Sequence, residues 1–186
     1  MVVPVKSFRT AKQRLAPALT PLERAELARH MATAVLRAAR PLLVWVACDD
    51  PEVADWARSE GARIIWTAGL GLNGAVSYAT NYVFSLGAER LTVVHGDLPL
   101  ATGFLWVQRQ RGIVLVPDRK GGGTNLVSLP KGASFQFSYG PGSFRRHYIS
   151  AWLSGLDIYI WRPKELCFDV DLPEDLAYLR LLSTNT

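Results

Sequence analysis

Three aspartates of the chain stand where an apolar run ends, and together they could hold a cation. Asp97 follows the run 91–95, whereas Asp169 and Asp171 follow the apolar stretch that begins at Ile158. In an extended segment, side chains two residues apart share one face at a spacing of about 6–7 Å. Like charges at that spacing repel, so the pair indicates either a bound metal or solvent. With Asp97 as a third ligand, the pattern favours a divalent metal such as Mg²⁺; the alternative is a solvated loop before a helix.

A glycine-rich segment at 117–125 is a first candidate phosphate site. It places three consecutive glycines beside Arg119 and Lys120, between two predicted strands. Main-chain N–H groups exposed in such a loop suit a phosphate. The segment lacks the Gly-Lys-Ser/Thr run that opens a helix in a P-loop, so a plain turn is the alternative.

The segment 139–147 is a second candidate anion site. It carries Gly140 and Gly142 ahead of a predicted helix that begins near Ser143. The free N–H groups of a helix N-terminus bind anions, although Ser143 could equally be a simple N-cap.

Basic residues gather after the first predicted strand, where they suit either a triphosphate or ordinary solvated loop charge. These cations are Lys6, Arg9, Lys12 and Arg14. The three histidines have no partner spacing that indicates a zinc site or a nucleophile pair, so none of them is assigned a catalytic role. They are His30, His95 and His147.

The elements that must position these residues alternate between short apolar runs and segments of helical period, which predicts a mostly parallel sheet flanked by helices. Strands are expected at 1–5, 42–48, 63–66, 91–95, 113–116, 126–128 and 135–137, and from 158 into Asp169. Helices are expected at 21–39, 50–59, 73–86, 142–153 and 174–182. In such sheets ligands bind at the carboxyl ends of the strands, where Asp97, Asp118 and Asp169 are predicted to lie.

The helix at 21–39 carries the clearest local signals. Thr20 and Glu23 form a capping box, and Pro21 suits the first helical position. An apolar stripe is expected to face the core through Leu22, Ala25, Ala28, Met31, Ala32, Val35 and Leu36.

Length and composition predict a single globular domain spanning residues 1–186. Apolar residues make up 49% of the chain and charged residues 20%, which is ordinary globular usage. The longest apolar run, 42–48, is far below the ~20 residues of a membrane span, and the first residues do not resemble a signal peptide. We therefore expect a soluble cytoplasmic protein. Cys48 and Cys167 lie in predicted strands without metal-ligand spacing, which predicts buried thiols.

Several motifs, taken in order, resemble the 2-phospho-L-lactate / phosphoenolpyruvate guanylyltransferase family of coenzyme F420 biosynthesis. They lie at 3–6, 11–15, 71–75, 96–100, 117–119, 123–125, 142–144 with His147, and 169–176. Each is weak alone, but the ordered set covers nearly the whole chain. Leu172 departs from the family pattern, which usually has Thr there.

The resemblance implies a single-domain, Rossmann-like nucleotidyltransferase fold that joins GTP to a small phosphorylated carboxylic acid and releases pyrophosphate. It implies that Asp97, Asp169 and Asp171 hold the metal, and that Thr124, Gly140 and Ser143 grip the acceptor phosphate. Lys6, Lys12 and Arg14 are the cations expected to neutralise charge during transfer. Asn73 and Gly74, near a predicted helix start, are candidates for contacting the nucleotide.

Two other functions fit parts of the sequence. Asp169-Val-Asp171 also suits a metal-dependent nucleotide-sugar glycosyltransferase. The net charge of +5 and six tryptophans suit a nucleic-acid-binding module, yet the cations form no single stripe and most aromatics lie in apolar runs. We therefore expect no nucleic-acid partner and no membrane partner. The acceptor acid and the oligomeric state are left open, a homodimer included.

Overall fold

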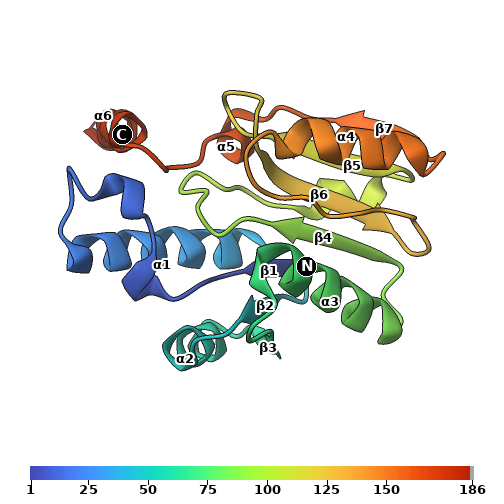
Figure 1. Ribbon diagram of the computed structural model, residues 1–186, viewed down its shortest axis with the longest axis horizontal. Coiled ribbons are helices and arrows are strands. Elements are labelled where there is room, and N and C mark those ends of the chain that lie inside the picture. The colour runs from blue at the N-terminus through green and yellow to red at the C-terminus, as the bar shows by residue number, and fades with distance from the viewer. Residues whose placement is uncertain (185–186) are drawn as a thin grey trace.

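A seven-stranded mixed sheet forms the centre of the protein, in the strand order β3-β2-β1-β4-β6-β5-β7 (Figure 1). The computed structural model describes residues 1–184. The strands are β1 (Val2–Pro4), β2 (Trp45–Cys48), β3 (Arg63–Trp66), β4 (Arg90–Val94), β5 (Ile113–Pro117), β6 (Thr124–Pro130) and β7 (Ile158–Ile160). The predicted α/β fold with a mostly parallel sheet is confirmed.

Strand β6 is the antiparallel member of the sheet, and this matters for the site. It pairs antiparallel with both β4 and β5, whereas β1, β2, β3 and β4 pair parallel with one another, and β5 with β7. Because Val94 pairs with Leu126, Thr124 at the start of β6 lies beside the carboxyl end of β4. The chain thus brings a strand beginning to the edge where parallel strands end.

Six helices surround the sheet, and separate apolar clusters fill its two faces (Figure 1). They are α1 (Pro21–Ala38), α2 (Pro51–Ser59), α3 (Gly71–Ser85), α4 (Ser143–Leu153), α5 (Lys164–Cys167) and α6 (Pro173–Thr184). Helices α1, α2 and α5 contribute to one cluster, and α3 and α4 to the other. Among residues 1–184, no helix is both long and apolar enough to cross a membrane.

Helix α1 follows its local sequence closely. The Thr20 hydroxyl accepts from the Glu23 N–H while the Glu23 carboxylate accepts from the Thr20 N–H, so the predicted capping box is confirmed. Most of the expected stripe is buried, but Leu22 is 70% exposed and Arg24 is buried instead. The stripe therefore begins one turn later than predicted.

The prediction of a strand at 135–137 is wrong, although its period of two is real. Phe137 and Tyr139 are buried, Ser138 between them is half-buried, and Gln136 before them is exposed. The segment pairs with no strand, because side chains of α4 and α3 take its N–H groups instead: Ser150 accepts from Gln136, His147 from Ser138, and Asn73 from Tyr139. Alternation thus identified a two-faced extended segment and not its hydrogen-bond partner.

The predicted strand from 158 into Asp169 is also wrong beyond its first residues. Strand β7 ends at Ile160, and the chain then enters the short helix α5 after Pro163, which has no N–H to extend a ladder. Cys167 accordingly lies in a helix and Asp169 follows a helix, although both thiols are buried as expected.

Candidate active site

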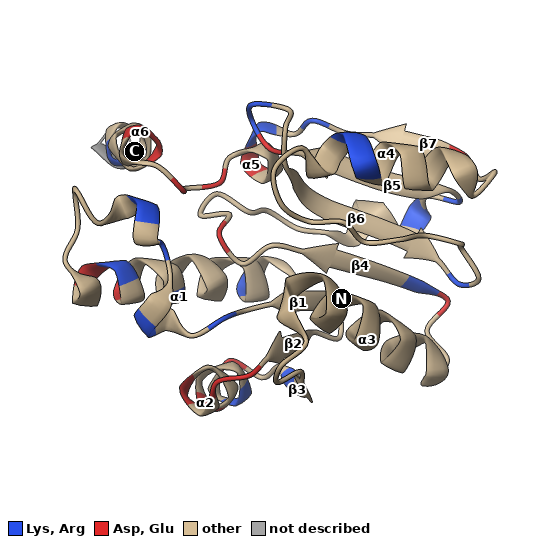
Figure 2. Ribbon diagram, in the orientation of Figure 1, with Lys and Arg blue, Asp and Glu red and all other residues tan. Residues whose placement is uncertain are grey.

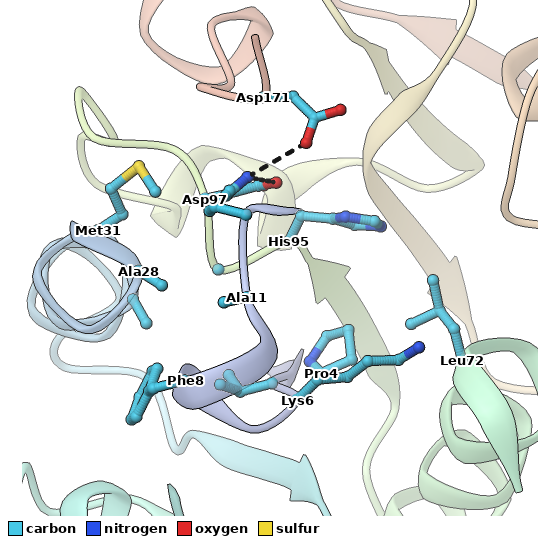
Figure 3. A pocket seen from close by; sticks show the side chains of 14 residues that line it. Pro4, Lys6, Phe8, Ala11, Ala28, Met31, Leu72, His95, Asp97 and Asp171 are labelled. Carbon is cyan, nitrogen blue, oxygen red and sulfur yellow. Dashed lines mark hydrogen bonds and ion pairs between the residues drawn. The ribbon is translucent and has the colours of Figure 1, made fainter. Parts of the chain in front are cut away.

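The ends of β1 and β4 open into a cavity of about 250 Å³ that contains several of the predicted site residues. Its polar lining consists of Lys6 and Lys12 from the segment after β1, His95 and Asp97 from the segment after β4, and Asp171 (Figure 3). Strand β1 pairs parallel with β4, so both segments leave the sheet at one edge. Of the predicted site residues, this cavity brings together Lys6, Lys12, Asp97 and Asp171, whereas Asp118 and Asp169 are not among its lining residues.

The ammonium group of Lys12 lies between two of the predicted aspartates. Its Nζ is 2.8 Å from Asp97 Oδ2 and 3.8 Å from Asp171 Oδ1. Dashed lines mark these contacts of Asp97 and Asp171 in Figure 3. Lys12 is also the only non-glycine residue with positive φ among residues 1–184, at 53°. Burial lowers the Lys12 pKa, but Asp97, Asp171 and Asp169 together outweigh burial and raise the pKa above its usual value. The buried cation is therefore charged and is held in a rare backbone conformation.

Asp97 has one oxygen paired and one without a hydrogen-bond partner. Burial raises its pKa, but Lys12 and His95 more than compensate, so the Asp97 pKa is below its usual value. Its Oδ1 is buried and accepts no hydrogen bond from the described part of the chain. A buried carboxylate oxygen of this kind is costly unless a ligand or water satisfies it.

Asp169 is in the opposite electrostatic situation. Burial, followed by the negative charge of Asp97, raises its pKa to about 6. Within residues 1–184, no three acidic, histidine or cysteine side chains are grouped as a metal cage. The negative charges of Asp97, Asp169 and Asp171 all act on the Lys12 ammonium group. The ammonium group is therefore the cation that these three carboxylates share in this structure.

Two of the remaining cations reach this region and one does not. Arg14 Nη1 contacts Asp171 Oδ2 at 2.7 Å, and Lys6 extends toward Leu72 at the start of α3 (Figure 3). Figure 2 shows the acidic segment before α6 next to the basic segment between β1 and α1. Arg9 instead pairs with Glu52 in α2.

A second, uncharged group of residues surrounds the start of α4. Thr124 and Ser143 are 3% and 2% exposed, and their hydroxyl oxygens lie 3.3 Å apart. Gly142 is the N-cap of α4, with φ at 71°, and it makes no side-chain cap. The N-cap alternative for Ser143 is therefore wrong: Ser143 is the first helical residue and its hydroxyl contacts Thr124.

His147 completes this group. Its Nδ1 lies 2.9 Å from Thr124 Oγ1, and its Nε2 accepts from the Ser138 N–H at 2.8 Å. The ring is fully buried, and burial lowers its pKa to about 4 with contributions from His95 and Arg146. A neutral ring whose Nε2 accepts must carry its hydrogen on Nδ1, so His147 donates to Thr124.

Gly140 and Asn73 shape the turn that leads into α4. Gly140 has φ at 119°, a conformation that favours glycine. The Asn73 amide contacts both main-chain groups of Tyr139, with its Oδ1 at 2.6 Å from N and its Nδ2 at 3.4 Å from O. Helix α3 begins at Gly71, so Asn73 and Gly74 lie inside its first turn. The Asn73 amide thus links α3 to the turn, and a Cβ added at Gly74 would lie 3.2 Å from Leu70 Cβ.

The glycine run at 121–123 is a turn stabilised by its own aspartate. The Asp118 carboxylate accepts from the N–H groups of Gly122 and Gly123 at 2.9 and 2.7 Å. Two of the donors expected to suit a phosphate are therefore engaged within the loop. The plain-turn alternative describes this segment.

One ion pair connects this turn to the segment of Asp171. Arg119 contacts Asp175 Oδ1 at 2.7 Å, and Asp175 Oδ2 accepts from the N–H groups of Asp171 and Leu172. Sequence reasoning missed this pair and the contact of His147 with Thr124. Their signals are single polar residues 56 and 23 positions from their partners, so no local spacing reveals them.

Comparison with known proteins gives a consistent result. The family model for guanylyl transferases like CofC matches residues 1–186. A phosphoenolpyruvate guanylyltransferase of Sphaerobacter thermophilus is 36% identical over 96% of this chain and 90% of its own length. One of Rubrobacter xylanophilus is 37% identical over 96% and 91%. A 2-phospho-L-lactate guanylyltransferase of Methanocaldococcus infernus is 29% identical over 95% and 82%.

Solved structures with the same fold come from more distant proteins. A protein of Desulfovibrio desulfuricans G20, provisionally assigned as a nucleotide-diphospho-sugar transferase, has a TM-score of 0.78 at 17% identity and covers all of this chain, which spans 87% of it. The 4-diphosphocytidyl-2C-methyl-D-erythritol synthase of Anaerococcus prevotii has a TM-score of 0.59 at 9% identity, with 98% and 97% coverage. These likenesses confirm the predicted nucleotidyltransferase fold.

Proposed function

The chain belongs to the CofC-like guanylyl transferase family, and from that premise we propose that it transfers a guanylyl group from GTP to a small phosphorylated carboxylic acid. The observation that carries the proposal is the position of Lys12 between Asp97 and Asp171, at the same sheet edge as Thr124. One side of this edge offers charges for a triphosphate and a metal, and the other offers neutral donors for a second phosphate. The products are a diphosphate-linked guanosine and pyrophosphate.

The chemical step needs positioning more than proton transfer. A phosphate oxygen of the acceptor attacks the α-phosphorus of GTP, and the bond from that phosphorus to the oxygen bridging to the β-phosphate breaks. The second pKa of a phosphomonoester is about 6, so the acceptor is already mostly dianionic at neutral pH. No side chain has to remove a proton from it. This agrees with a neutral, fully hydrogen-bonded His147 near the acceptor side.

The donor set of the three aspartates fits Mg²⁺. All the ligands are carboxylate oxygens, the type that Mg²⁺ prefers. The orphaned Oδ1 of Asp97 is a buried acceptor without a partner in the described chain, and Lys12 already marks a place for positive charge. When bound by Asp97, Asp169 and Asp171, the metal would neutralise phosphate charge. Lys12 and the metal would then share Asp97.

Lys6, Lys12 and Arg14 are proposed to bind the triphosphate. Lys6 and Lys12 line the cavity, and Arg14 is held beside it through Asp171. Their charges would hold the leaving pyrophosphate in line with the attacking oxygen and stabilise the negative charge that spreads onto it.

The guanine base is proposed to bind next to Lys6, at the ends of β2 and β3. A small cavity there is lined by Lys6, Asp49, Thr67 and Leu72. Asp49 is exposed, and a carboxylate can accept from the N–H donors of guanine, which adenine presents differently. Asn73 and Gly74 lie in the adjoining first turn of α3 and stay candidates for shaping this pocket.

Phosphoenolpyruvate is the proposed acceptor, ahead of 2-phospho-L-lactate. Two relatives named for phosphoenolpyruvate are 36% and 37% identical to this chain, and others with that name range down to 29%, whereas two relatives named for 2-phospho-L-lactate are 29% and 28% identical. The two acids differ by only a few atoms, so the assay must include both, together with 3-phosphoglycerate. Within coenzyme F420 biosynthesis, this reaction would activate the acid as its guanosine diphosphate derivative.

One assay tests the proposal. Purified protein, Mg²⁺, one nucleoside triphosphate and one acceptor are incubated in every combination, and pyrophosphate is measured. We expect release with GTP well ahead of ATP, CTP and UTP, and only when an acceptor is present. Comparable rates with ATP would refute the base preference, and use of a nucleotide sugar without pyrophosphate release would indicate a glycosyltransferase.

A further inference from the structure

His147 lies one contact behind the proposed acceptor site, and its bonding determines how the hydroxyl groups in front of it are used. The ring accepts from Ser138 at Nε2 and therefore donates from Nδ1 to Thr124 Oγ1. Because His147 Nδ1 is the donor of this bond, Thr124 cannot donate its own hydroxyl hydrogen to the histidine. The Thr124 hydroxyl hydrogen is therefore free to be donated to another acceptor.

Thr124 and Ser143 form a pair with two hydroxyl hydrogens and one bond between them. Their oxygens lie 3.3 Å apart, so one hydrogen is used between the two side chains. Within residues 1–184, this bond and the one from His147 are the only hydrogen bonds of the two hydroxyl groups. The second hydroxyl hydrogen therefore has no acceptor in the described part of the chain. The pair adjoins the exposed turn of Gly140 and Gly142. One buried hydroxyl hydrogen therefore stays available beside the turn.

We propose that His147 is a positioning residue for acceptor binding: its Nδ1–H fixes the Thr124–Ser143 pair as a net donor toward an oxygen of a fully deprotonated phosphomonoester. The inference rests on the proposed function. It adds that the Thr124–Ser143 pair offers a hydrogen to an unprotonated phosphate oxygen. The dianion has three such oxygens with more negative charge on each, and the monoanion has two, so the pair favours the dianion, which is also the form that attacks GTP.

Two substitutions separate the two bonds of the ring. An Asn amide ends as many bonds from Cβ as Nδ1 does, so His147→Asn can keep the donor to Thr124 and loses the acceptor for Ser138. A Gln amide ends at the distance of Nε2, so His147→Gln can keep the acceptor for Ser138 and loses the donor to Thr124. Both variants remove the same buried ring, which makes each the matched control of the other.

Steady-state pyrophosphate release with GTP, Mg²⁺ and phosphoenolpyruvate is the first readout. We expect His147→Gln to raise the KM for phosphoenolpyruvate about tenfold or more, with the KM for GTP within about twofold. His147→Asn should raise the phosphoenolpyruvate KM by less than about threefold. In a Thr124→Val background, His147→Gln should add nothing further, because its target is gone. Equal effects of Asn and Gln, or the reverse order, would mean that His147 only supports the Ser138 segment and would overturn the proposal.

The tautomer can be measured without turnover. Nitrogen NMR of the His147 ring should show a neutral imidazole protonated at Nδ1, and a ring protonated at Nε2 would overturn the inference whatever the activity. If the wild-type protein released no pyrophosphate with any acceptor, the proposed function would fail by that result alone. Calorimetric titration of phosphoenolpyruvate into the wild type and both variants would then decide the inference, since only His147→Gln should weaken binding about tenfold.

Discussion

The site has an aspartate side, formed by Lys12, Asp97, Asp169 and Asp171, and a hydroxyl side, formed by Thr124, Ser143 and His147. Both are built from distant parts of the chain, but their polar groups differ in how far they are paired. On the aspartate side, Lys12 stands between like charges, Asp97 has an unpaired oxygen, and the Asp169 pKa is raised. On the hydroxyl side, Thr124 and His147 are neutral, buried and hydrogen-bonded to one another. The first group is electrostatically unsatisfied, and the second is nearly satisfied.

This difference indicates what each side is built to bind. Unpaired buried charge costs stability, so it persists where a ligand can compensate it, here a cation with a triphosphate. A nearly complete hydrogen-bond network costs little and fixes geometry, which suits a phosphate that must be aimed. Substitutions on each side test this contrast, and the largest effect is expected at Asp97.

Asp97→Asn should give the largest loss on the aspartate side. Its carboxylate pairs with Lys12, and its second oxygen is the unsatisfied acceptor. We expect kcat to fall at least about a hundredfold with only a small change in melting temperature, because charge stabilisation is lost in the transition state. Asp55→Asn is the matched control, since Asp55 is an exposed carboxylate on α2 paired with Arg58. Near-normal turnover of Asp97→Asn in Mg²⁺ would place the metal elsewhere.

Gly140→Val tests the hydroxyl side without removing a polar group. Gly140 has φ at 119°, and an added Cβ would come no closer than 3.8 Å to Arg146 Nη2. The expected loss therefore comes from backbone strain and from obstruction of an approaching phosphate. We expect the KM for phosphoenolpyruvate to rise at least about tenfold, or turnover to vanish, while calorimetric GTP binding is nearly unchanged.

Gly132→Val controls for strain alone. Gly132 has φ at 80°, and nothing lies within 4 Å of an added Cβ. It follows β6, at the end of that strand away from Thr124. It should therefore lose stability as Gly140→Val does and keep its acceptor KM. A folded Gly140→Val protein that uses acceptor normally would show that this turn does not bind the acceptor phosphate.

The pH dependence of stability should distinguish the buried His147 from an ordinary histidine. Its pKa is lowered to about 4 in the folded protein, so the unfolded chain binds the extra proton first as pH falls below about 6.5. The stability that a neutral His147 contributes is present above that pH and is lost as pH falls toward 4. Arg146 and His95 are the charged or titratable groups that act on it.

The measurement is urea unfolding of the wild type and of His147→Gln at pH 7 and pH 4.5. We expect the wild type to lose roughly 1–3 kcal/mol more than the variant between these values. The two proteins share every other titrating group, so the difference isolates His147. A parallel loss in both would mean that the ring is not held neutral by the fold.

Sequence reasoning located the aspartate side better than the hydroxyl side, for a physical reason. Asp97 meets Lys12 because the parallel strands β1 and β4 end at one edge, a rule that applies to the whole fold. Asp171 reaches Lys12 from the segment after α5, where the sequence predicts a strand. The capping box of α1 was equally accessible, since it lies within four residues.

The hydroxyl side depends on tertiary contacts instead. Thr124 reaches the edge because β6 is antiparallel, and His147 meets Thr124 only after α4 has packed on the sheet. The segment 135–139 has the alternation of a strand, yet side chains of α3 and α4 bind its main chain. No local pattern states which neighbour an extended segment will find.

Arg119→Met should have the smallest effect, and it tests whether the two sides are mechanically connected. Arg119 lies in the turn between β5 and β6, and this turn leads into Thr124 on the hydroxyl side. Through Asp175, Arg119 fixes the main chain of Asp171 on the aspartate side. Its side chain is 45% exposed, so the ion pair is worth only about 0.5–1 kcal/mol. We expect kcat to fall by roughly two- to fivefold, with the KM for GTP and for acceptor nearly unchanged, because Asp171 is less well positioned while both sides keep their groups.

Lys120→Met is the matched control for Arg119→Met. Lys120 is the neighbouring residue, and it pairs with the exposed Glu174 at 3.6 Å, a contact that does not hold the main chain of Asp171. If both variants lowered kcat equally, the cause would be lost positive charge near the site. If neither did, the aspartate and hydroxyl sides would be positioned independently, each by its own strand ends.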